Sequence, residues 1–311
     1  MRILVLIAAV CFAGGCGGKI SAGLPIDMDP NDPKPDLIGP SSDMVNVLDQ
    51  ASPPDMAPFS FANWIPPSKG LWIWHWDYIG KTAQEAAQVA FDLGVSYVLI
   101  KSGQDASQWS DRYNATTVGE FTKRGIRVLA WPYITTNDIP GSIDAAVEAA
   151  LVPGTDGLVL DVEIEWEQGG DYSAQAEALC KGIRAGAPDT FLAYSSWGWV
   201  GYHGGFPFTA FDTYCGDAYF AQVYFSDRGV TWDGSKGLPQ ALQMYEDEGL
   251  KAPLWVAISN DDVSPTTNGP ATLDLNDALD AAGPRTSLWE FPGKSWPEKV
   301  DQLYQLHWDN P

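Results

Sequence analysis

An alternation of strand-like and helical segments over residues 66–311 constrains the fold of this chain more than any other feature. Short apolar runs recur about every 24 to 35 residues, and alanine-rich helical patterns fill most of the intervals. Eight such units over ~250 residues match an α/β fold of the (β/α)8 TIM barrel type better than a doubly wound open sheet. The predicted strands begin near Leu71, Val95, Ile126, Gly157, Thr190, Ala218, Pro253 and Thr286.

Helical patterns and glycines mark the joints between these strands. A glycine directly after a helical run serves as a left-handed C-cap that turns the chain back toward the next strand. We expect this role for Gly94, Gly125, Gly186, Gly249 and Gly283. The predicted helices cover Thr82–Leu93, Ile143–Leu151, Ala174–Ala185, Leu238–Glu248, Leu273–Ala282 and Pro297–Leu306.

The first 65 residues have the composition of a targeting segment and a tether. Arg2 precedes a short apolar run that cannot span a bilayer, so residues 1–15 are predicted to be a signal peptide. The small residues before Cys16 resemble a bacterial lipobox, which implies lipidation of Cys16, a membrane anchor and a place in the bacterial cell envelope. Gly17 after this cysteine favours the outer membrane under the sorting rule of some Gram-negative species. Residues 16–65 are rich in Pro and Asp, and we expect a disordered tether.

The predicted barrel domain, residues 66–311, is strongly acidic and has few metal ligands. Its 33 acidic and 15 basic residues disfavour nucleic acid and anionic polymers as partners, whereas a neutral polysaccharide or oligosaccharide, the expected partner, would be indifferent to this charge. Three histidines without a spaced cluster predict no metal site, and we expect no cofactor. Cys180 and Cys215 are the two cysteines of this segment; an oxidising envelope permits a disulfide, and the sequence leaves the pairing open.

Closely spaced carboxylates end the predicted fourth strand. Because strand side chains alternate, Asp161, Glu163 and Glu165 share one face and project together from the carboxyl end. A glycosidase needs such a pair: one carboxylic acid protonates the leaving oxygen, and a second negative group stabilises an oxocarbenium-like centre. The alternative is a solvated strand end without chemistry. The apolar residues of the opposite face are Leu158, Leu160 and Val162.

The ends of the other predicted strands supply rings and hydrogen-bonding groups. Flat indoles can stack on the apolar faces of sugar rings, whereas Trp72, Trp255 and some other tryptophans are expected to fill the core. His75 is as readily a structural residue as a substrate contact. The candidate substrate-binding residues are Trp74, Trp76, Asp77, Trp131, Tyr194, Gln222, Tyr224 and Trp289.

Several strand ends together resemble the family 25 glycoside hydrolases, which are lysozyme-type muramidases. The resemblance rests on the acid-x-acid run at Asp161–Glu163, Tyr194-Ser195, Ala221–Tyr224 and Leu288–Phe291. It implies that Glu163 protonates the glycosidic oxygen and that Asp161 assists and orients the N-acetyl group of the substrate.

The chain departs from that family at the first strand. The family begins this strand with an aspartate, and Trp72 stands at that position here. Asp77, several residues further along, is the candidate substitute. The departure leaves open whether the domain is a divergent hydrolase or a non-catalytic glycan binder.

The same acidic strand also resembles the family 18 chitinase-like enzymes. The run Asp156–Glu163 matches their Asp-Gly-x-Asp-x-Asp-x-Glu pattern, except that Val159 replaces the middle acid. This resemblance again makes Glu163 the acid, with Asp161 holding the substrate amide, whose own carbonyl attacks the anomeric carbon. It also implies Tyr224 as a hydrogen-bond partner and Trp289 as a sugar platform.

Both resemblances imply cleavage beside an N-acetylhexosamine, and an envelope lipoprotein meets peptidoglycan first. The alternatives are a chitin-like polymer, a glycan-binding lipoprotein without catalysis, or a structural protein of the surface. For catalysis we expect Glu163 to be protonated beside an ionised Asp161. Glu165 and Glu167 are expected to be solvated loop charges, and Lys101 either counters the acidic mouth or pairs with Asp105.

Overall fold

The computed structural model describes residues 68–309 except 80, 226–230, 261–271 and 292–299. These residues fall within one compact unit, Ala51–Pro311. The predicted signal peptide at 1–15, the Cys16 lipidation site and most of the tether at 16–65 therefore lie outside this unit, and all of them lie outside the described residues.

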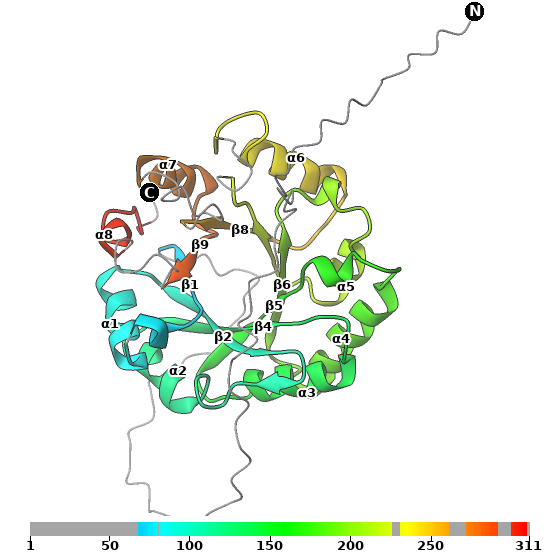
Figure 1. Ribbon diagram of the computed structural model, residues 1–311, viewed down its shortest axis with the longest axis horizontal. Helices are drawn as coiled ribbons and strands as arrows, with labels where there is room; N and C mark the ends of the chain where they lie inside the picture. The colour runs from blue at the N-terminus through cyan, green and yellow to red at the C-terminus, as the bar shows by residue number, and fades with distance from the viewer. Residues whose placement is uncertain (1–67, 80, 226–230, 261–271, 292–299, 310–311) are drawn as a thin grey trace, which may run out of the picture. The chain divides into compact units, whose positions relative to one another are not determined.

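The described part of the chain contains a closed barrel of parallel strands with helices around it, as Figure 1 shows. Pairing of β1 with both β2 and β9 closes the sheet, which confirms the predicted (β/α)8 barrel. A two-residue strand, β3 (Ser107–Gln108), pairs antiparallel with the end of β2. The barrel strands are β1 (Gly70–Ile73), β2 (Tyr97–Gln104), β4 (Arg127–Tyr133), β5 (Thr155–Asp161), β6 (Phe191–Trp197), β7 (Tyr219–Gln222), β8 (Leu254–Ser259) and β9 (Thr286–Phe291).

Helices lie between successive strands on the outside of the barrel. The sequence patterns did not predict α2, which is short and rich in threonine, or α5, which is rich in aromatic residues. For α2, the Asn114 side chain accepts hydrogen bonds from two backbone amides, so its N-cap is the signal that could have located the helix. The helices are α1 (Ala83–Asp92), α2 (Ala115–Thr122), α3 (Ile139–Ala150), α4 (Ser173–Gly186), α5 (Phe208–Tyr214), α6 (Leu238–Asp247), α7 (Thr272–Ala282) and α8 (Val300–Leu303).

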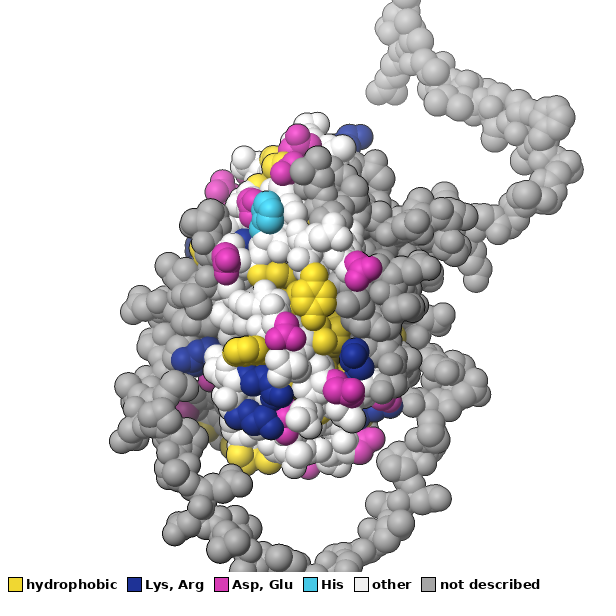
Figure 2. Space-filling view, turned by 90° about the vertical axis from the view of Figure 1, so that its left-hand side faces the viewer, with side chains coloured by type: hydrophobic (Ala, Val, Ile, Leu, Met, Phe, Trp, Pro, Cys, Tyr) yellow, Lys and Arg dark blue, Asp and Glu magenta, His cyan; other side chains and the backbone are white. Residues whose placement is uncertain are grey.

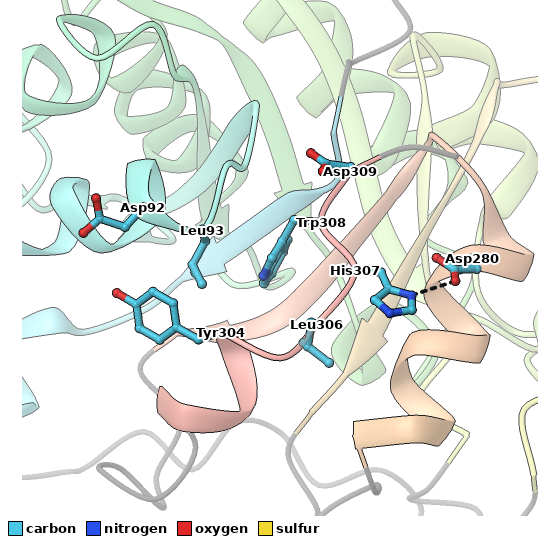
Figure 3. A pocket seen from close by; sticks show the side chains of 8 residues that line it. All are labelled: Asp92, Leu93, Asp280, Tyr304, Leu306, His307, Trp308 and Asp309. Atoms are coloured by element: carbon cyan, nitrogen blue, oxygen red, sulfur yellow. Dashed lines mark hydrogen bonds and ion pairs between the residues drawn. The ribbon is translucent and has the colours of Figure 1, made fainter.

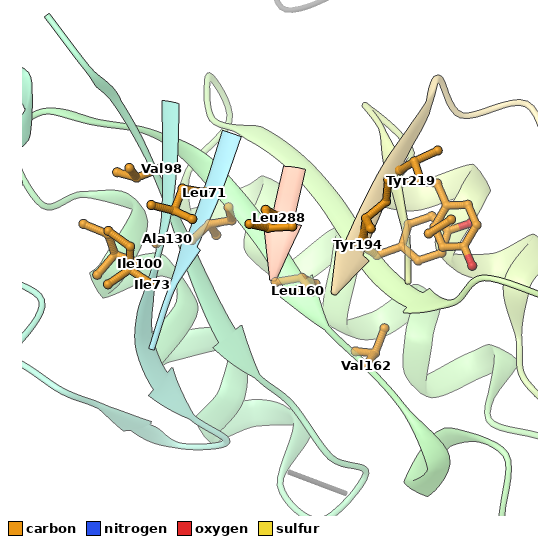
Figure 4. Packing of buried hydrophobic residues seen from close by; sticks show 14 of the residues in the cluster. Leu71, Ile73, Val98, Ile100, Ala130, Leu160, Val162, Tyr194, Tyr219 and Leu288 are labelled. Atoms are coloured by element: carbon orange, nitrogen blue, oxygen red, sulfur yellow. The ribbon is translucent and has the colours of Figure 1, made fainter. Parts of the chain in front are cut away.

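Alternating strand side chains form two buried layers. One layer fills the space between strands and helices, and Figure 4 shows part of it. The other fills the barrel interior, where Trp72 contacts Trp131 and Phe220 edge to face and donates its indole N–H to Ser287 Oγ at 2.9 Å. Trp72 therefore occupies the middle of the barrel as a packing residue. The helix-facing layer includes Leu71, Ile73, Val98, Ile100, Ala130, Leu160, Val162, Tyr194, Tyr219 and Leu288.

Glycines end several helices as the sequence predicts. Positive φ angles at Gly94, Gly125, Gly249 and Gly283 confirm the left-handed C-caps. The prediction for Gly186 is wrong, because this residue is the last of α4 and its backbone is not left-handed.

Helices α3 and α4 pack closely because α4 carries glycines on the contact face. A Cβ at Gly186 would lie 2.6 Å from Val147 Cγ2, and one at Gly182 would lie 2.5 Å from Ile143 Cδ1. The absence of side chains at these two positions lets the helices approach each other.

A disulfide bond joins Cys180 in α4 to Cys215 at the end of α5. Both residues are buried. The bond resolves the pairing that the sequence left open and links two helices that flank β6.

None of the helices in the described part of the chain combines the length and apolar character needed to cross a bilayer. Acidic and basic side chains are interspersed on the face shown in Figure 2.

The close α3–α4 contact predicts opposite effects for two Gly→Ala substitutions. Gly182→Ala should lower the free energy of unfolding by about 1 kcal/mol, because overpacking against Ile143 outweighs the gain in helix propensity. Gly119→Ala in α2, where nothing lies within 4 Å of the added Cβ, should raise it by about 0.5–1 kcal/mol. Urea unfolding of both variants checks this, and equal stabilisation by the two would contradict it.

Candidate active site

Asp161 and Glu163 lie side by side at the carboxyl end of β5, the end at which barrels of this type hold their active sites. Asp161 is the last residue of β5, and Glu163 directly precedes the short 3-10 helix η3 (Ile164–Trp166). Only 2% of Asp161 and 5% of Glu163 is exposed. Leu160 and Val162, on either side of Asp161, point into the helix-facing layer (Figure 4), so the two acids face the barrel interior.

Gln222, the last residue of β7, holds the two acids together. Its Nε2 donates to Asp161 Oδ1 at 3.0 Å and to Glu163 Oε1 at 2.9 Å, and it lies 3.3 Å from Ser195 Oγ. Ser195 in β6 lies beside Asp161 in the sheet register, which places it between the acid and the glutamine. A single side-chain amide therefore fixes the spacing of both carboxyl groups.

Burial raises the pKa of both carboxyl groups. For Asp161, burial and then the neighbouring Glu163 raise the pKa well above its ordinary value, against the opposing charge of Lys101. Burial also raises the pKa of Glu163, and the hydrogen bond from Gln222 opposes this rise. The pair therefore retains one shared proton at a pH where exposed carboxyl groups are ionised.

Lys101 lowers and Glu165 raises the pKa of both carboxyl groups, so the two groups titrate as a pair. Burial raises the pKa of Glu163 as expected, and the assignment of the shared proton to Glu163 beside an ionised Asp161 stays a prediction.

Lys101 is a buried cation close to this pair. Only 1% of Lys101 is exposed, and its Nζ lies 4.0 Å from the ring centroid of Trp131 and 5.1 Å from that of Tyr133. Burial lowers the pKa of Lys101 to about 7, while Asp161, Glu163 and Asp105 act to raise it. Direct pairing with Asp105 is not found: the Asp105 carboxylate accepts the backbone N–H of Thr135, and Nζ has no hydrogen-bond partner among the described residues.

Tyr133 connects a third carboxylate to the site. Tyr133 lies beside Asp161 in the register of β4 and β5, and its hydroxyl donates to Glu165 Oε2 at 2.8 Å. Glu165 also adds to the rise in the pKa of Asp161 and Glu163, so it is not the distant loop charge that we expected. Glu167 pairs with Nδ1 of His203 at 2.8 Å. The sheet register with Asp161 is the signal that could have identified Tyr133.

Trp74 and Trp289 form an aromatic wall at the carboxyl ends of β1 and β9. Their rings lie nearly parallel with centroids 6.4 Å apart, and Trp289 is partly exposed at the end of β9. Trp289 also contacts Trp72 and Trp131 edge to face. These contacts fix the ring orientation, and the partly exposed indole of Trp289 offers a surface on which a sugar ring could stack.

Three predicted substrate contacts occupy packing positions instead. Trp131 is fully buried in the barrel, and its indole N–H donates to Ile73 O at 3.1 Å, so it packs in the barrel interior below the site. Trp76 belongs to the helix-facing layer. Tyr194 stacks on Tyr219, also in that layer (Figure 4), because it alternates with the inward-facing Ser195. None of the three side chains faces the mouth of the barrel.

Asp77 does not replace the missing acid of the first strand. It is about half exposed and forms an ion pair with Arg112 at 3.1 Å. Arg112 also contacts the buried His75, and burial followed by the charges of Arg112 and Lys101 lowers the pKa of His75 to about 3. His75 is therefore a neutral structural residue in a cluster with Asp77 and Arg112. Tyr224 lies two residues past the end of β7 and is half-buried, which leaves it a candidate contact.

A separate hollow of about 430 Å³ lies at the opposite, amino-terminal end of the barrel, shown in Figure 3. Its walls come from the end of α1, from α7 and from the segment after α8, and Ser68 just before β1 bridges to Asp309 there. This is the end of the barrel away from the acids, so the hollow is not the candidate active site. The residues that line the hollow are Asp92, Leu93, Asp280, Tyr304, Leu306, His307, Trp308 and Asp309.

Within the described residues there is no group of three His, Cys, Asp or Glu side chains suited to a metal ion.

Two solved structures with low sequence identity share the fold of this chain. The catalytic domain of a mannanase from Streptomyces sp. SirexAA-E matches 81% of this chain and 87% of its own, with a TM-score of 0.50 and 14% identity. The Bacillus cereus spore cortex-lytic enzyme SleL matches 76% of this chain and 74% of its own, with a TM-score of 0.51 and 10% identity. The shared feature is the barrel fold. No protein-family model and no curated protein matches the sequence.

The buried pair predicts a pH-dependent gain in stability from Asp161→Asn. Because the folded-state pKa of Asp161 is raised above its unfolded value of about 3.9, its stabilisation is full below about pH 4 and is lost as the pH rises through the folded-state pKa. Asparagine is uncharged at every pH, and its side-chain oxygen can still accept the hydrogen bond from Gln222. The variant should therefore exceed the parent in unfolding free energy by about 1 kcal/mol or more at pH 8 and match it near pH 4.

Urea unfolding at the two pH values measures this difference. Asp144→Asn on the exposed surface of α3 is the matched control and should leave stability unchanged at both. A loss of stability in Asp161→Asn at pH 8 would contradict the raised pKa.

Proposed function

We propose that this protein is a glycoside hydrolase that cleaves a glycan beside an N-acetylhexosamine, with Glu163 as the general acid and Asp161 as the assisting group. The observation that carries the proposal is the buried pair of acids bridged by Gln222 at the carboxyl end of β5. A singly protonated carboxyl pair supplies both a proton donor and a negative charge in one site, which is what acetal cleavage requires. The barrel fold shared with glycan-cleaving enzymes agrees with this assignment.

The first step needs no nucleophile from the first strand. Trp72 fills the position at which a family 25 enzyme would carry its aspartate, and Asp77 is engaged with Arg112. The substrate's own acetamido carbonyl oxygen therefore attacks the anomeric carbon. Glu163 transfers a proton to the leaving oxygen as the glycosidic bond breaks, and the new ring carries a positive charge that the Asp161 carboxylate stabilises through the amide N–H.

The substrate amide also explains how the shared proton reaches Glu163. The raised pKa of both carboxyl groups lets them share one proton in the ligand-free protein. An amide N–H that donates to Asp161 favours its ionised form and therefore moves the proton to Glu163. In the second step a water attacks the anomeric carbon, gives its proton to the Glu163 carboxylate and releases the acetamido group. Gln222 holds both carboxyl groups in place throughout.

Peptidoglycan is the proposed polymer and the bacterial cell envelope the proposed location. Both rest on the lipobox-like sequence at Cys16, which would anchor the chain, with the outer membrane as the proposed site of anchoring. The acidic domain is compatible with a neutral glycan segment. Trp74, Trp289 and Tyr224 are the proposed sugar contacts.

A glycan-binding protein without catalysis is the second candidate function. The missing first-strand acid favours it, because the aromatic wall alone can hold a sugar. The two candidates differ in whether Glu163 is needed for turnover or only lines the site.

The proposed role of Glu163 predicts loss of turnover without loss of binding in Glu163→Gln. Glutamine has a shape similar to that of glutamic acid but cannot donate a carboxylic proton, so release of new reducing ends should fall by well over a hundredfold. Purified protein is incubated with peptidoglycan and, separately, with chitin oligosaccharides, and reducing ends are quantified. Glu148→Gln on the exposed surface of α3 is the matched control and should retain parental activity.

The two substrates and a binding assay separate the alternatives. Release from peptidoglycan by the parent supports the proposed polymer, whereas release from chitin alone transfers the proposal to a chitin-like substrate. Binding of either glycan by the parent and by Glu163→Gln, with no reducing ends from either protein, would overturn the hydrolase and support the binding protein.

A further inference from the structure

A buried amine without a hydrogen-bond partner stands out beside the proposed catalytic pair. Lys101 Nζ is enclosed and has no hydrogen-bond partner among the described residues. A charged group taken out of water without such partners is costly, and replacement of a buried ion by an apolar residue is often neutral or stabilising. The position of Lys101 is therefore not explained by stability of the barrel.

The sheet register directs this amine toward the acids. Lys101 lies beside Trp131 in the pairing of β2 with β4, and Tyr133, two residues along β4, lies beside Asp161 in the pairing of β4 with β5. Side chains two residues apart on a strand share a face, so Lys101, Trp131, Tyr133 and Asp161 all point into the barrel interior. The ring of Trp131 lies directly against the amine at 4.0 Å.

We propose that Lys101 is a positioning residue whose ammonium charge holds the Asp161–Glu163 pair in its singly protonated form. With Lys101 charged, one proton on the pair leaves the three groups electrically neutral together. A second proton would make this buried site positive, and loss of the shared proton would make it negative. The rings of Trp131 and Tyr133 favour the cation from one side, and they exclude water that would screen its field.

Other charged groups around Lys101 agree with this role. The carboxylates raise the pKa of Lys101 against burial, and Lys101 in turn lowers the pKa of Asp161 and Glu163. His75 is neutral, so it adds no competing positive charge. Within the described part of the chain, the titratable groups that interact electrostatically with the amine or the pair include His75 beyond β1, Asp105 beyond β2, Tyr133 on β4, and Glu165 beyond β5.

The proposal predicts that Lys101→Met moves the titration of the pair to higher pH. Removal of a positive charge raises a carboxyl pKa, so the acidic limb of the pH–rate profile, measured below pH 7 where Lys101 is charged, should shift upward by about one pH unit or more. Lys123→Met removes a surface charge from the end of α2 and is the matched control, which should keep the parental profile. A shift in Lys101→Met with none in Lys123→Met supports the positioning role, and an unshifted acidic limb in Lys101→Met overturns it.

The inference rests on the proposed hydrolase, so a second measurement that does not depend on turnover is needed. Carbon-13 NMR of the Asp and Glu side-chain carboxyl groups reports the titration of the pair directly. The parent and Lys101→Met are titrated without glycan, with Asp161→Asn and Glu163→Gln used to assign the resonances. Resonances of the pair that titrate at the same pH in both proteins overturn the role of Lys101. Absence of reducing ends from the parent, with the NMR shift present, would overturn the hydrolase alone.

Discussion

The hydrogen bonds from Gln222 to Asp161 and Glu163 are the interaction on which the rest of the site depends. Two buried carboxyl groups repel each other when both are ionised, and one donor amide between them fixes their separation while the shared proton relieves the repulsion. This contact requires β5 and β7 to be held at a fixed register across β6. The closed barrel supplies that register, because its strands cannot slide without breaking the pairing on both sides.

Several groups in the site lower the stability of the folded state. Buried carboxyl groups with raised pKa values weaken the folded state as the pH rises, and Lys101 is enclosed without a hydrogen-bond partner among the described residues. The surrounding packing compensates: the tryptophans of the barrel interior contact one another edge to face, and a disulfide joins two helices outside β6. A rigid scaffold of this kind can hold a polar site that would not form in a looser core.

The barrel could be predicted because its strands and helices alternate regularly along the sequence. Asp161 and Glu163 could be predicted as neighbours because the alternation of side chains along one strand depends only on local sequence. Prediction failed where orientation depends on distant elements. Tyr194 lies on β6 but faces the helix layer, and which set of alternating side chains faces inward is fixed only when the sheet closes. Trp76 packs in the same layer because the chain turns into a short 3-10 helix (Trp76–Ile79) after β1. The sequence did not show the relation of Lys101 to Asp161 for the same reason. Lys101 on β2 and Asp161 on β5 are brought into one site only by the pairing of both strands with β4.

The structure of Glu163→Gln bound to an N-acetylglucosamine oligosaccharide tests the central claim most directly. The account predicts that the acetamido N–H of one sugar donates to Asp161, that the glycosidic oxygen lies within hydrogen-bond reach of residue 163, and that Trp289 lies against a sugar ring. A glycan bound with its acetamido group away from Asp161, or bound elsewhere on the barrel, would contradict the account.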